Sequence, residues 1–445
     1  MLGLRSRSAS ALWTARRLER QIERLHARLV LTPRFYELEQ DGVTFASLVR
    51  HKATFSRLLA KTIARGNYVP APAQVRSILV DDKERRVFSL PLTDLILHSA
   101  ITDLIEHAAA SVLSPNLYSY RKGRSWWTVV NAFAQYARQH RSERPDPRQR
   151  GLYVLRRDVE AYADSIPVAD GSPLWAMLRD ALASTRLTEI DWQLITHAIR
   201  PEAFEAPGRL FVQHRGVPTG LPIASVLFNL YLTKLDRELD AIPGAFYARY
   251  SDDILFAHPS PDVARAASDT IDRVLKELRL GLKPHKRRDL YLTAAGKRSD
   301  VWPDTRPAMA VPMLGCRVSA HGLVALNRKK FRRLLRDLNT RALRTAATAR
   351  GDAGAKGRLI CAAINRALGH QSDPLKPSAT DLVRRVVTDR AQLQQLDYWI
   401  ARSVVRAVSD RDDARVFRNL PYSRLRGEWK LRSLVHARNR WGRGR

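Results

Sequence analysis

The chain has 445 residues, of which 45% are hydrophobic and 27% are charged. This balance excludes a largely disordered protein, and the length is enough for two to three domains. The formal net charge of +32 is far more than solubility requires, so it predicts a polyanionic partner, most commonly nucleic acid. No apolar run approaches the ~18 residues of a transmembrane helix, and we expect no membrane partner.

The N-terminal stretch is rich in Arg and Ser and poor in acids, as organelle transit peptides are. Four residues then recur at helical spacing and favour an ordinary amphipathic helix instead: Leu18, Ile22, Leu25 and Leu29. The 2 cysteines, Cys316 and Cys361, are far apart and have no histidine nearby at ligand spacing. We expect both to be core thiols in a reducing compartment.

Two strand-like runs at residues 75–80 and 87–90 flank a charged turn and predict a β-hairpin. A helix with an apolar face is predicted at residues 95–104. The loop at residues 119–125 precedes another predicted helix and carries three cations: Arg121, Lys122 and Arg124. Such a loop suits phosphate binding at a helix N-terminus. The alternative is a solvated loop in which Ser125 serves only as the N-cap of the helix.

The central third mixes strands and helices without regular alternation, which favours an α+β fold. Residues 151–155 (GLYVL) have the pattern of a buried strand, and Asp158 lies just beyond them. Capping signals at residues 172–173 and 188–191 predict two helices.

A loop rich in Gly and Pro at residues 216–222 precedes one predicted long helix at residues 223–235. Residues 246–256 (FYARYSDDILF) then form two apolar runs around a tight corner, which predicts a β-hairpin with Asp252 and Asp253 at its tip.

From about residue 325 the chain is basic and helical in pattern. Residues 351–357 (GDAGAKG) predict a flexible break. Residues 424–445 interleave arginines, Arg424, Arg438 and Arg440 among them, with Trp429 and Trp441. That pattern suits a nucleic-acid track, and a solvated helix face with core tryptophans fits it equally well.

Three carboxylates stand out: Asp158, Asp252 and Asp253. Adjacent carboxylates repel unless a positive charge lies beside them, and oxygen ligands alone suit Mg²⁺. If the strand at residues 151–155 lies beside the hairpin, the three acids converge and can hold two Mg²⁺ ions for in-line displacement at phosphorus. A turn that uses Asp only for its local geometry is the simpler alternative.

Four ordered segments resemble the motifs of reverse transcriptases. Tyr250-Ser251-Asp252-Asp253 resembles the Y-x-D-D box, and residues 158–166 resemble the first palm motif. Residues 216–236 are similar to the motif between them, and Met313-Leu314-Gly315 is similar to the primer-grip corner. The resemblance covers residues 65–325.

The resemblance implies an α+β right-hand polymerase. Residues 1–64 would be an N-terminal helical extension, residues 65–325 the fingers and an RRM-like antiparallel palm, and residues 326–445 a basic α-helical thumb. RNA-dependent DNA synthesis with two Mg²⁺ ions, or Mn²⁺ as a substitute, is the implied activity. The implied partners are dNTPs, an RNA template, its DNA product and a dedicated non-coding RNA.

The resemblance also implies residue roles. Metal ligands would be Asp158, Val159, Asp252 and Asp253, with Lys286 as proton donor to the leaving pyrophosphate. The incoming nucleotide would meet Arg86, Tyr162, Ala163, Thr219 and Gly220. Phosphates would meet the basic residues of the loop and the thumb, namely Arg121, Lys122, Arg124, Arg424, Arg438 and Arg440.

Two positions depart from the family pattern. Thr219 stands where the family has Gln, and Ala163 stands where it has the bulky ring that excludes a 2′-hydroxyl. Residues 417–440 resemble the abortive-infection and unknown-group bacterial enzymes, which implies antiphage defence in the cytoplasm. Template-independent or protein-primed synthesis, and a non-catalytic RNA-binding role, are the alternatives.

Overall fold

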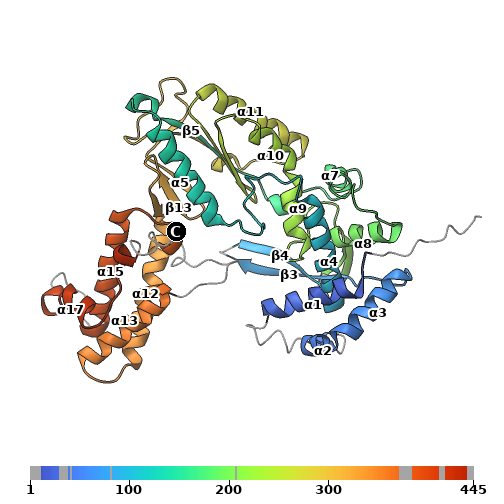
Figure 1. The fold of residues 1–445 in the computed structure, drawn as a ribbon, viewed down its shortest axis with the longest axis horizontal. Coiled ribbons are helices and arrows are strands. Elements are labelled where there is room, and N and C mark those ends of the chain that lie inside the picture. Colours follow the sequence, from blue (N-terminus) through green and yellow to red (C-terminus); the bar gives the residue numbers. More distant parts are fainter. Residues whose placement is uncertain are drawn as a thin grey trace, which may run out of the picture. The chain divides into compact units, whose positions relative to one another are not determined.

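The computed structural model describes residues 12–29, 39–40, 43–80, 83–205, 208–369, 383–409 and 416–437 (Figure 1). The chain divides into two compact units. The first contains Met1–Lys122, Arg156–Ile254 and Arg265–Arg287, and the second contains Gly123–Leu155, Leu255–Ala264 and Arg288–Arg445. Among the described residues, no helix is both long enough and apolar enough to cross a membrane. The linear division at residues 64 and 325 stays a prediction.

The first unit begins with helices that pack on one another. Helix α1 (Ala15–Leu29) buries Leu18 and Ile22 and contacts α3 (Lys52–Ala64) and α4 (Leu92–Ala109). This confirms the amphipathic helix expected there. Two short strands, β1 (Glu39–Gln40) and β2 (Val43–Thr44), and helix α2 (Phe45–Arg50) lie between α1 and α3 in the chain.

The predicted hairpin at residues 75–90 is confirmed. Strands β3 (Ala73–Val80) and β4 (Lys83–Ser89) are antiparallel, with Gln74 opposite Ser89. Strands β6 (Glu202–Glu205) and β7 (Arg209–Val212) complete a four-stranded sheet in the order β4-β3-β6-β7.

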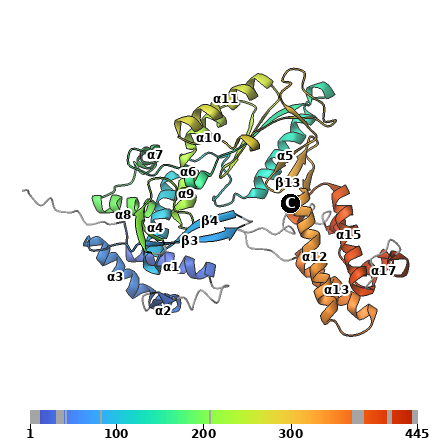
Figure 2. The ribbon, with the colours of Figure 1, turned by 180° about the vertical axis from the view of Figure 1, so that it is seen from behind.

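Helix α9 (Ile223–Tyr231) contacts α4, α7 (Pro173–Ala181) and α8 (Glu189–Ile199) (Figure 2). Both predicted helix starts are confirmed, because α7 has Pro at its first turn and α8 has a capping box between Thr188 and Asp191. α9 is apolar on nearly every side and is buried along its length, which suits a central helix.

The single long helix predicted at residues 223–235 is wrong, because the chain forms two helices. α9 ends at Tyr231, and α10 (Thr233–Asp240) begins after Leu232. The hydroxyl of Thr233 donates to the Leu230 carbonyl at 2.8 Å, and Arg249 donates to the carbonyls of Phe228 and Asn229. These donors satisfy carbonyl groups that a continuous helix would have paired internally.

A five-stranded sheet has the order β11-β10-β5-β9-β8. β8 (Phe246–Tyr250) and β9 (Asp253–His258) form the predicted hairpin, and β5 (Leu152–Asp158) lies next to β9. β10 (Arg288–Leu292) and β11 (Arg306–Ala308) pair in parallel, with Leu290 opposite Arg306. Helix α6 (Tyr162–Ser165) follows β5, and α11 (Pro261–Glu277) follows β9.

The second unit joins a small sheet to a helical bundle. Strands β12 (Ala310–Met313), β13 (Cys316–Ser319) and β14 (Val324–Leu326) are antiparallel, and α5 (Trp126–Ser142) packs on β13. Ser125 is the N-cap residue of α5, and its N–H donates to Thr128 Oγ1 at 2.9 Å, which confirms the predicted helix start.

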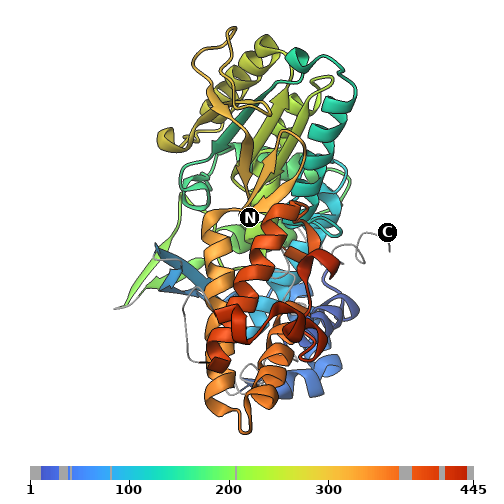
Figure 3. The same cartoon turned by 90° about the vertical axis from the view of Figure 1, so that its left-hand side faces the viewer.

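The bundle contains α12 (Arg328–Thr348), α13 (Ala353–Gly369) and α15 (Arg390–Ser409), which pack against one another (Figure 3). Short helices α16 (Val416–Asn419) and α17 (Tyr422–Gly427) follow. Cys316 and Cys361 are both buried free thiols, as expected, and burial raises the pKa of each to about 12.

The flexible break predicted at residues 351–357 is wrong, because α13 begins at Ala353. The Asp352 carboxylate accepts a hydrogen bond from the Ala355 N–H at 2.7 Å and caps the helix. Gly357 faces the ring of Trp429, and a Cβ there would lie 2.4 Å from that ring. Trp429 is buried, so it is a core residue.

Candidate active site

The predicted acidic hairpin places two carboxylates at its tip. β8 is almost fully buried, and the chain turns at Ser251, whose φ is +56°. Asp252 lies in the turn, and Asp253 begins β9. Turns commonly hold a residue in this left-handed region, and Ser251 needs outside support to stay there because it is not glycine.

Asp158 and Asp252 come together at the ends of neighbouring strands. The Val159 N–H donates to the Asp252 carbonyl at 3.2 Å, so the two catalytic candidates are joined through the backbone. Burial, and after it the negative charge of Asp158, raises the pKa of Asp252 above its ordinary value. The structure therefore brings Asp158 and Asp252 near each other, whereas the expected group of three acids able to hold metal is not found among the described residues.

Two lysines neutralise Asp158. Lys283 Nζ lies 2.6 Å from one carboxylate oxygen and Lys286 Nζ lies 2.7 Å from the other. Burial acts to raise the pKa of Asp158, but the two lysine hydrogen bonds outweigh it and the pKa is lowered. Burial likewise opposes the charge on Lys283, but its hydrogen bond to Asp158 and the negative charges of Asp158 and Asp252 together outweigh burial and raise the pKa of Lys283.

Asp253 faces a different cation. Its carboxylate lies 2.7 Å from a guanidinium nitrogen of Arg156, which is two residues before Asp158 on β5. Residues two apart in a strand share a face, so Arg156 and Asp158 lie on the same side of the sheet. Within the described ranges, no three His, Cys, Asp or Glu side chains are arranged to hold a metal ion.

A buried ion pair lies directly behind the turn. Arg249 and Asp236 are 0% and 1% exposed and 2.6 Å apart. Arg249 also donates to the carbonyls of Asn229 at 2.9 Å, and of Phe228 and Ser251 at 3.3 Å each. One guanidinium thus links α10, the end of α9 and the turn at Ser251.

The amide side of the same turn is held by Ser119. The Ser251 N–H donates to Ser119 Oγ at 2.9 Å, and that hydroxyl donates to Asn229 Oδ1 at 3.0 Å. The Asn229 side chain returns a hydrogen bond to the Ser119 carbonyl at 2.9 Å. Both backbone groups of Ser251 therefore have fixed partners, which supports its positive φ.

The predicted nucleotide residues lie around one loop. The Val217 N–H donates to the Ala163 carbonyl at 2.8 Å, and the Phe88 N–H on β4 donates to the Thr219 carbonyl at 2.8 Å. Gly220 has φ +102°, and a Cβ there would lie 2.7 Å from the Phe88 carbonyl oxygen. Only glycine fits this close approach of two backbones.

Arg86 lies two residues before Phe88 on β4 and is exposed. Its guanidinium pairs with Glu205 at 3.3 Å and lies 5.3 Å from the centre of the Phe211 ring. Tyr162 is only 4% exposed, and its hydroxyl donates to the Phe228 carbonyl at 2.7 Å. Tyr162 therefore belongs to the core beneath Ala163.

The predicted phosphate-binding residues lie in two separate segments of the chain, the loop at residues 121–124 and the C-terminal region. Arg121 donates to the Ser114 carbonyl at 2.5 Å, and Lys122 and Arg124 are exposed. Arg424 pairs with Glu428 at 2.9 Å. Arg438, Arg440 and Trp441 lie outside the described residues.

Sequence reasoning missed Lys283, Arg156, Arg249 and Asp236. Lys283 lies three residues before Lys286 in the same basic segment, and Arg156 shares the strand face of Asp158, so both left a spacing signal. Arg249 and Asp236 left no comparable signal, because their pairing depends on how α10 lies against β8.

A family model described as reverse transcriptase (RNA-dependent DNA polymerase) matches residues 80–318, more than half of the 445 residues. A curated protein from Nasonia vitripennis, the retrovirus-related Pol polyprotein from type-1 retrotransposable element R2, is 27% identical over 169 residues. The match covers 36% of this chain and 16% of that protein, so the chain spans about a sixth of the relative's length.

Two solved telomerase structures are also similar. Telomerase from Candida albicans with the TWJ fragment of telomeric RNA gives a TM-score of 0.45 at 11% identity, covering 85% of this chain and 67% of that chain. Telomerase from Candida tropicalis with the TWJ fragment of telomeric RNA gives a TM-score of 0.46 at 10% identity, and the match covers 92% of this chain and 70% of that chain. The family match confirms the expected α+β reverse-transcriptase fold class. It includes Asp158, at the end of β5, and Asp252, in the turn between β8 and β9. The chain belongs to the reverse transcriptase (RNA-dependent DNA polymerase) family.

Proposed function

We propose that this chain adds deoxynucleotides to a 3′-hydroxyl by RNA-directed phosphoryl transfer at Asp158 and Asp252. The observation that carries the proposal is the meeting of these carboxylates at neighbouring strand ends, where burial and then the charge of Asp158 raise the pKa of Asp252. Two acids placed together in partly buried surroundings suit a divalent cation.

The donors at this site fit Mg²⁺, with Mn²⁺ as a substitute, because they are all oxygen atoms. We assign two ions to Asp158, Asp252 and the backbone of Val159, with Asp253 in a supporting place beside Arg156. When bound, the ions supply charge that activates the attacking hydroxyl and neutralises the triphosphate.

The two lysines beside Asp158 are the second part of the proposal. In the structure they provide the positive charge that the acid requires. With a metal ion held by Asp158, both ammonium groups would be free to pair with phosphate instead. We assign Lys286 as the proton donor to pyrophosphate and Lys283 as a second cation at the same place.

The incoming nucleotide would lie beside the joined loop at residues 216–220 and β4, which are in direct contact. Arg86 would exchange Glu205 for the triphosphate, since an exposed pair contributes little stability of its own. Thr219 and Gly220 fix the loop on β4, and Ala163 is joined to it through Val217. The proposed partners are dNTPs, an RNA template and its DNA product, with a dedicated non-coding RNA as a candidate template.

Primer extension tests the proposal. The purified chain is given Mg²⁺, dNTPs and a primer on RNA, a primer on DNA, or no template. We expect extension on RNA, and Asp252→Asn or Asp158→Asn should lower it by at least about a hundredfold. Synthesis without any template would support untemplated or protein-primed synthesis instead. RNA binding without synthesis would support the non-catalytic alternative, and undiminished synthesis by Asp252→Asn would overturn the site.

We also propose a role in antiphage defence in the bacterial cytoplasm, supported only by the resemblance of residues 417–440. Cells that express the natural chain should show fewer phage plaques than cells that express Asp252→Asn. Equal plaque counts for the two chains across a phage panel would remove the defence role and leave the polymerase proposal intact.

A further inference from the structure

A groove in the second unit runs between α12 and α15. One part has a volume of about 580 Å³ and begins at β13 and β14, where Arg317 and Leu326 lie. A second part of about 370 Å³ continues along the same helices. The two parts share Leu335 and Trp399, so they form one continuous groove.

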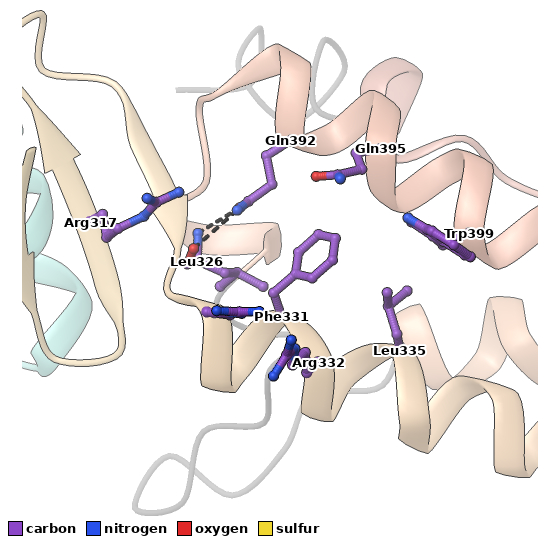
Figure 4. Close-up of a pocket in the computed structure, with 9 residues that line it drawn as sticks. Arg317, Leu326, Phe331, Arg332, Leu335, Gln392, Gln395 and Trp399 are labelled. Carbon is purple, nitrogen blue, oxygen red and sulfur yellow. Dashed lines mark hydrogen bonds between the residues drawn. The ribbon is translucent and has the colours of Figure 1, made fainter. Parts of the chain in front are cut away.

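The groove combines positive charge with aromatic rings. Its arginines are Arg317, Arg328, Arg332, Arg336, Arg402 and Arg406, and none of the described residues that line it is acidic. Phe331 and Leu335 on α12 lie across from Gln395 and Trp399 on α15 (Figure 4). Trp399 is 37% exposed, and the Arg402 guanidinium lies 5.2 Å from its ring centre.

The groove has a fixed shape at its end near β14. Gln392 accepts a hydrogen bond from the Leu326 N–H at 2.6 Å and donates one to the Leu326 carbonyl at 3.0 Å (Figure 4). Leu334 and Leu338, on another side of α12, are each 2% exposed and hold the helix in the bundle. Phe331 and Leu335 are only half-buried and line the groove.

We propose that this groove binds a single-stranded nucleic acid. Arginines take the phosphates, and exposed aromatic rings stack on bases, which is how unpaired strands are bound without sequence preference. The positive lining matches a polyanion. From Gln392 to Arg406 the groove follows ~21 Å of helix at 1.5 Å per residue, enough for about six stacked nucleotides. A duplex keeps its bases stacked inside and cannot use the rings.

This inference rests on the proposed polymerase only for the source of the strand, which would be unpaired template RNA or displaced DNA. Binding itself is measured without dNTPs, so it does not depend on catalysis. Loss of extension in Asp252→Asn tests the active site, and loss of strand binding in groove variants tests the groove.

The experiment measures fluorescence anisotropy of labelled oligo-dT and oligo-U, each of about 20 nucleotides, and of a blunt duplex of the same length. We expect Trp399→Leu, and Arg332→Gln with Arg336→Gln, each to weaken single-strand binding about tenfold. Duplex binding should change less than about threefold. The oligo-dT and oligo-U arms distinguish a DNA strand from an RNA strand.

Matched controls lie on the same two helices. Tyr398→Leu changes the exposed neighbour of Trp399, and Arg333→Gln with Arg341→Gln removes equal charge from α12 outside the groove. Both controls should change single-strand binding less than about twofold. Photocrosslinking of 5-iodouridine in the strand should also label the peptide that contains Phe331 or Trp399. This measurement locates the binding site in the natural chain.

Unchanged single-strand affinity in both groove variants, or crosslinks confined to other peptides, would overturn the proposal. Equal losses for duplex and single strand would also overturn it, because the rings would then not contribute. A competition measurement compares an acidic polypeptide with unlabelled nucleic acid as competitors of the labelled strand. Displacement of the strand by the acidic polypeptide, with no preference of the groove for unlabelled nucleic acid, would assign the groove to a protein partner instead.

Discussion

The ionised carboxylate of Asp252 destabilises the folded chain, and the side chains around it do not offset this destabilisation. Burial and then the charge of Asp158 raise its pKa, so the folded state holds the Asp252 proton more tightly than the unfolded state. Stability therefore falls as the pH rises from the ordinary value of this carboxyl through the raised one. Asp158 has the opposite sign: its lowered pKa contributes stability at neutral pH that is lost on acidification.

We expect Asp252→Asn to raise the melting temperature at neutral pH in the presence of EDTA, because the buried charge is removed. A relief of ~1 kcal/mol corresponds to about 2–4 °C in a domain of 150–250 residues. Added Mg²⁺ should stabilise the natural chain more than the variant. Scanning calorimetry with and without EDTA checks both, and a lower melting temperature for Asp252→Asn would contradict the cost assigned to this charge.

Ala163 gives a prediction about the sugar. The structure holds Tyr162 in the core through its hydrogen bond to the Phe228 carbonyl, so that ring does not replace the wall that the family has at position 163. We expect weak discrimination between dNTPs and rNTPs, and we expect Ala163→Tyr to strengthen it by about tenfold to a hundredfold. Single-nucleotide incorporation gives kcat/KM for each pair.

Tyr162→Phe is the control for that measurement. It removes only the hydroxyl and should lower stability by ~1 kcal/mol without altering sugar preference. Strong deoxy preference in the natural chain that disappears in Tyr162→Ala would show that Tyr162 forms the wall.

At the scale of elements, the turn between β8 and β9 depends on α9 and α10. Arg249 joins these parts through Asp236 and three carbonyls. We expect Arg249→Lys to lower stability by about 3 kcal/mol, because a lysine cannot reach the same acceptors and leaves Asp236 poorly paired. It should lower kcat more than it raises KM, since the Ser251 turn and its Asp252 move.

Arg273→Lys is the matched control. Arg273 pairs with Glu238 and Glu277 on the surface and is 52% exposed, so the change should stay within about 0.5 kcal/mol and leave kcat unaltered. Denaturant melts and steady-state extension compare the two variants. Equal effects of the two substitutions on kcat would contradict a positioning role for Arg249.

Elements with local signals were predicted well from the sequence. The hairpins at β3–β4 and β8–β9, the strand before Asp158 and the capped starts of α5, α7 and α8 are all present. The two errors arose where a distant residue decides local structure. The α9–α10 break depends on donors that include Arg249, and glycine stands at position 357 because it packs closely on Trp429, not because the chain breaks there.

The candidate site likewise contains residues that can be recognised from the sequence and residues that only the structure identifies. Adjacent acids at a hairpin tip can be recognised from their spacing, and Asp158 from its place after a strand. Their cationic partners could not be chosen from a chain with 76 Lys and Arg residues. Lys283 and Arg156 become distinguishable only when their distances to Asp158 and Asp253 are known.

At the scale of the whole molecule, the charge of +32 predicts binding that weakens steeply with salt. Arg438, Arg440 and Arg443 lie outside the described residues, and their role stays a prediction from the sequence. Neutralising all three should reduce the log–log salt slope by about 0.7–0.9 for each phosphate that the tail no longer binds. Binding titrations from low to physiological salt measure this, and an unaltered slope would show that the tail does not touch the nucleic acid.

The Arg249–Asp236 pair also constrains how this sequence can evolve. Loss of either partner alone leaves a buried charge uncompensated, and exchange of the two would place a carboxylate among the carbonyl oxygens of Phe228, Asn229 and Ser251. Neither position can change first without a loss of stability, and reversal of the pair fails as well. The two sites are therefore strongly epistatic: replacing both partners together should cost less stability than the sum of the two single replacements, because no unpaired charge then stays buried.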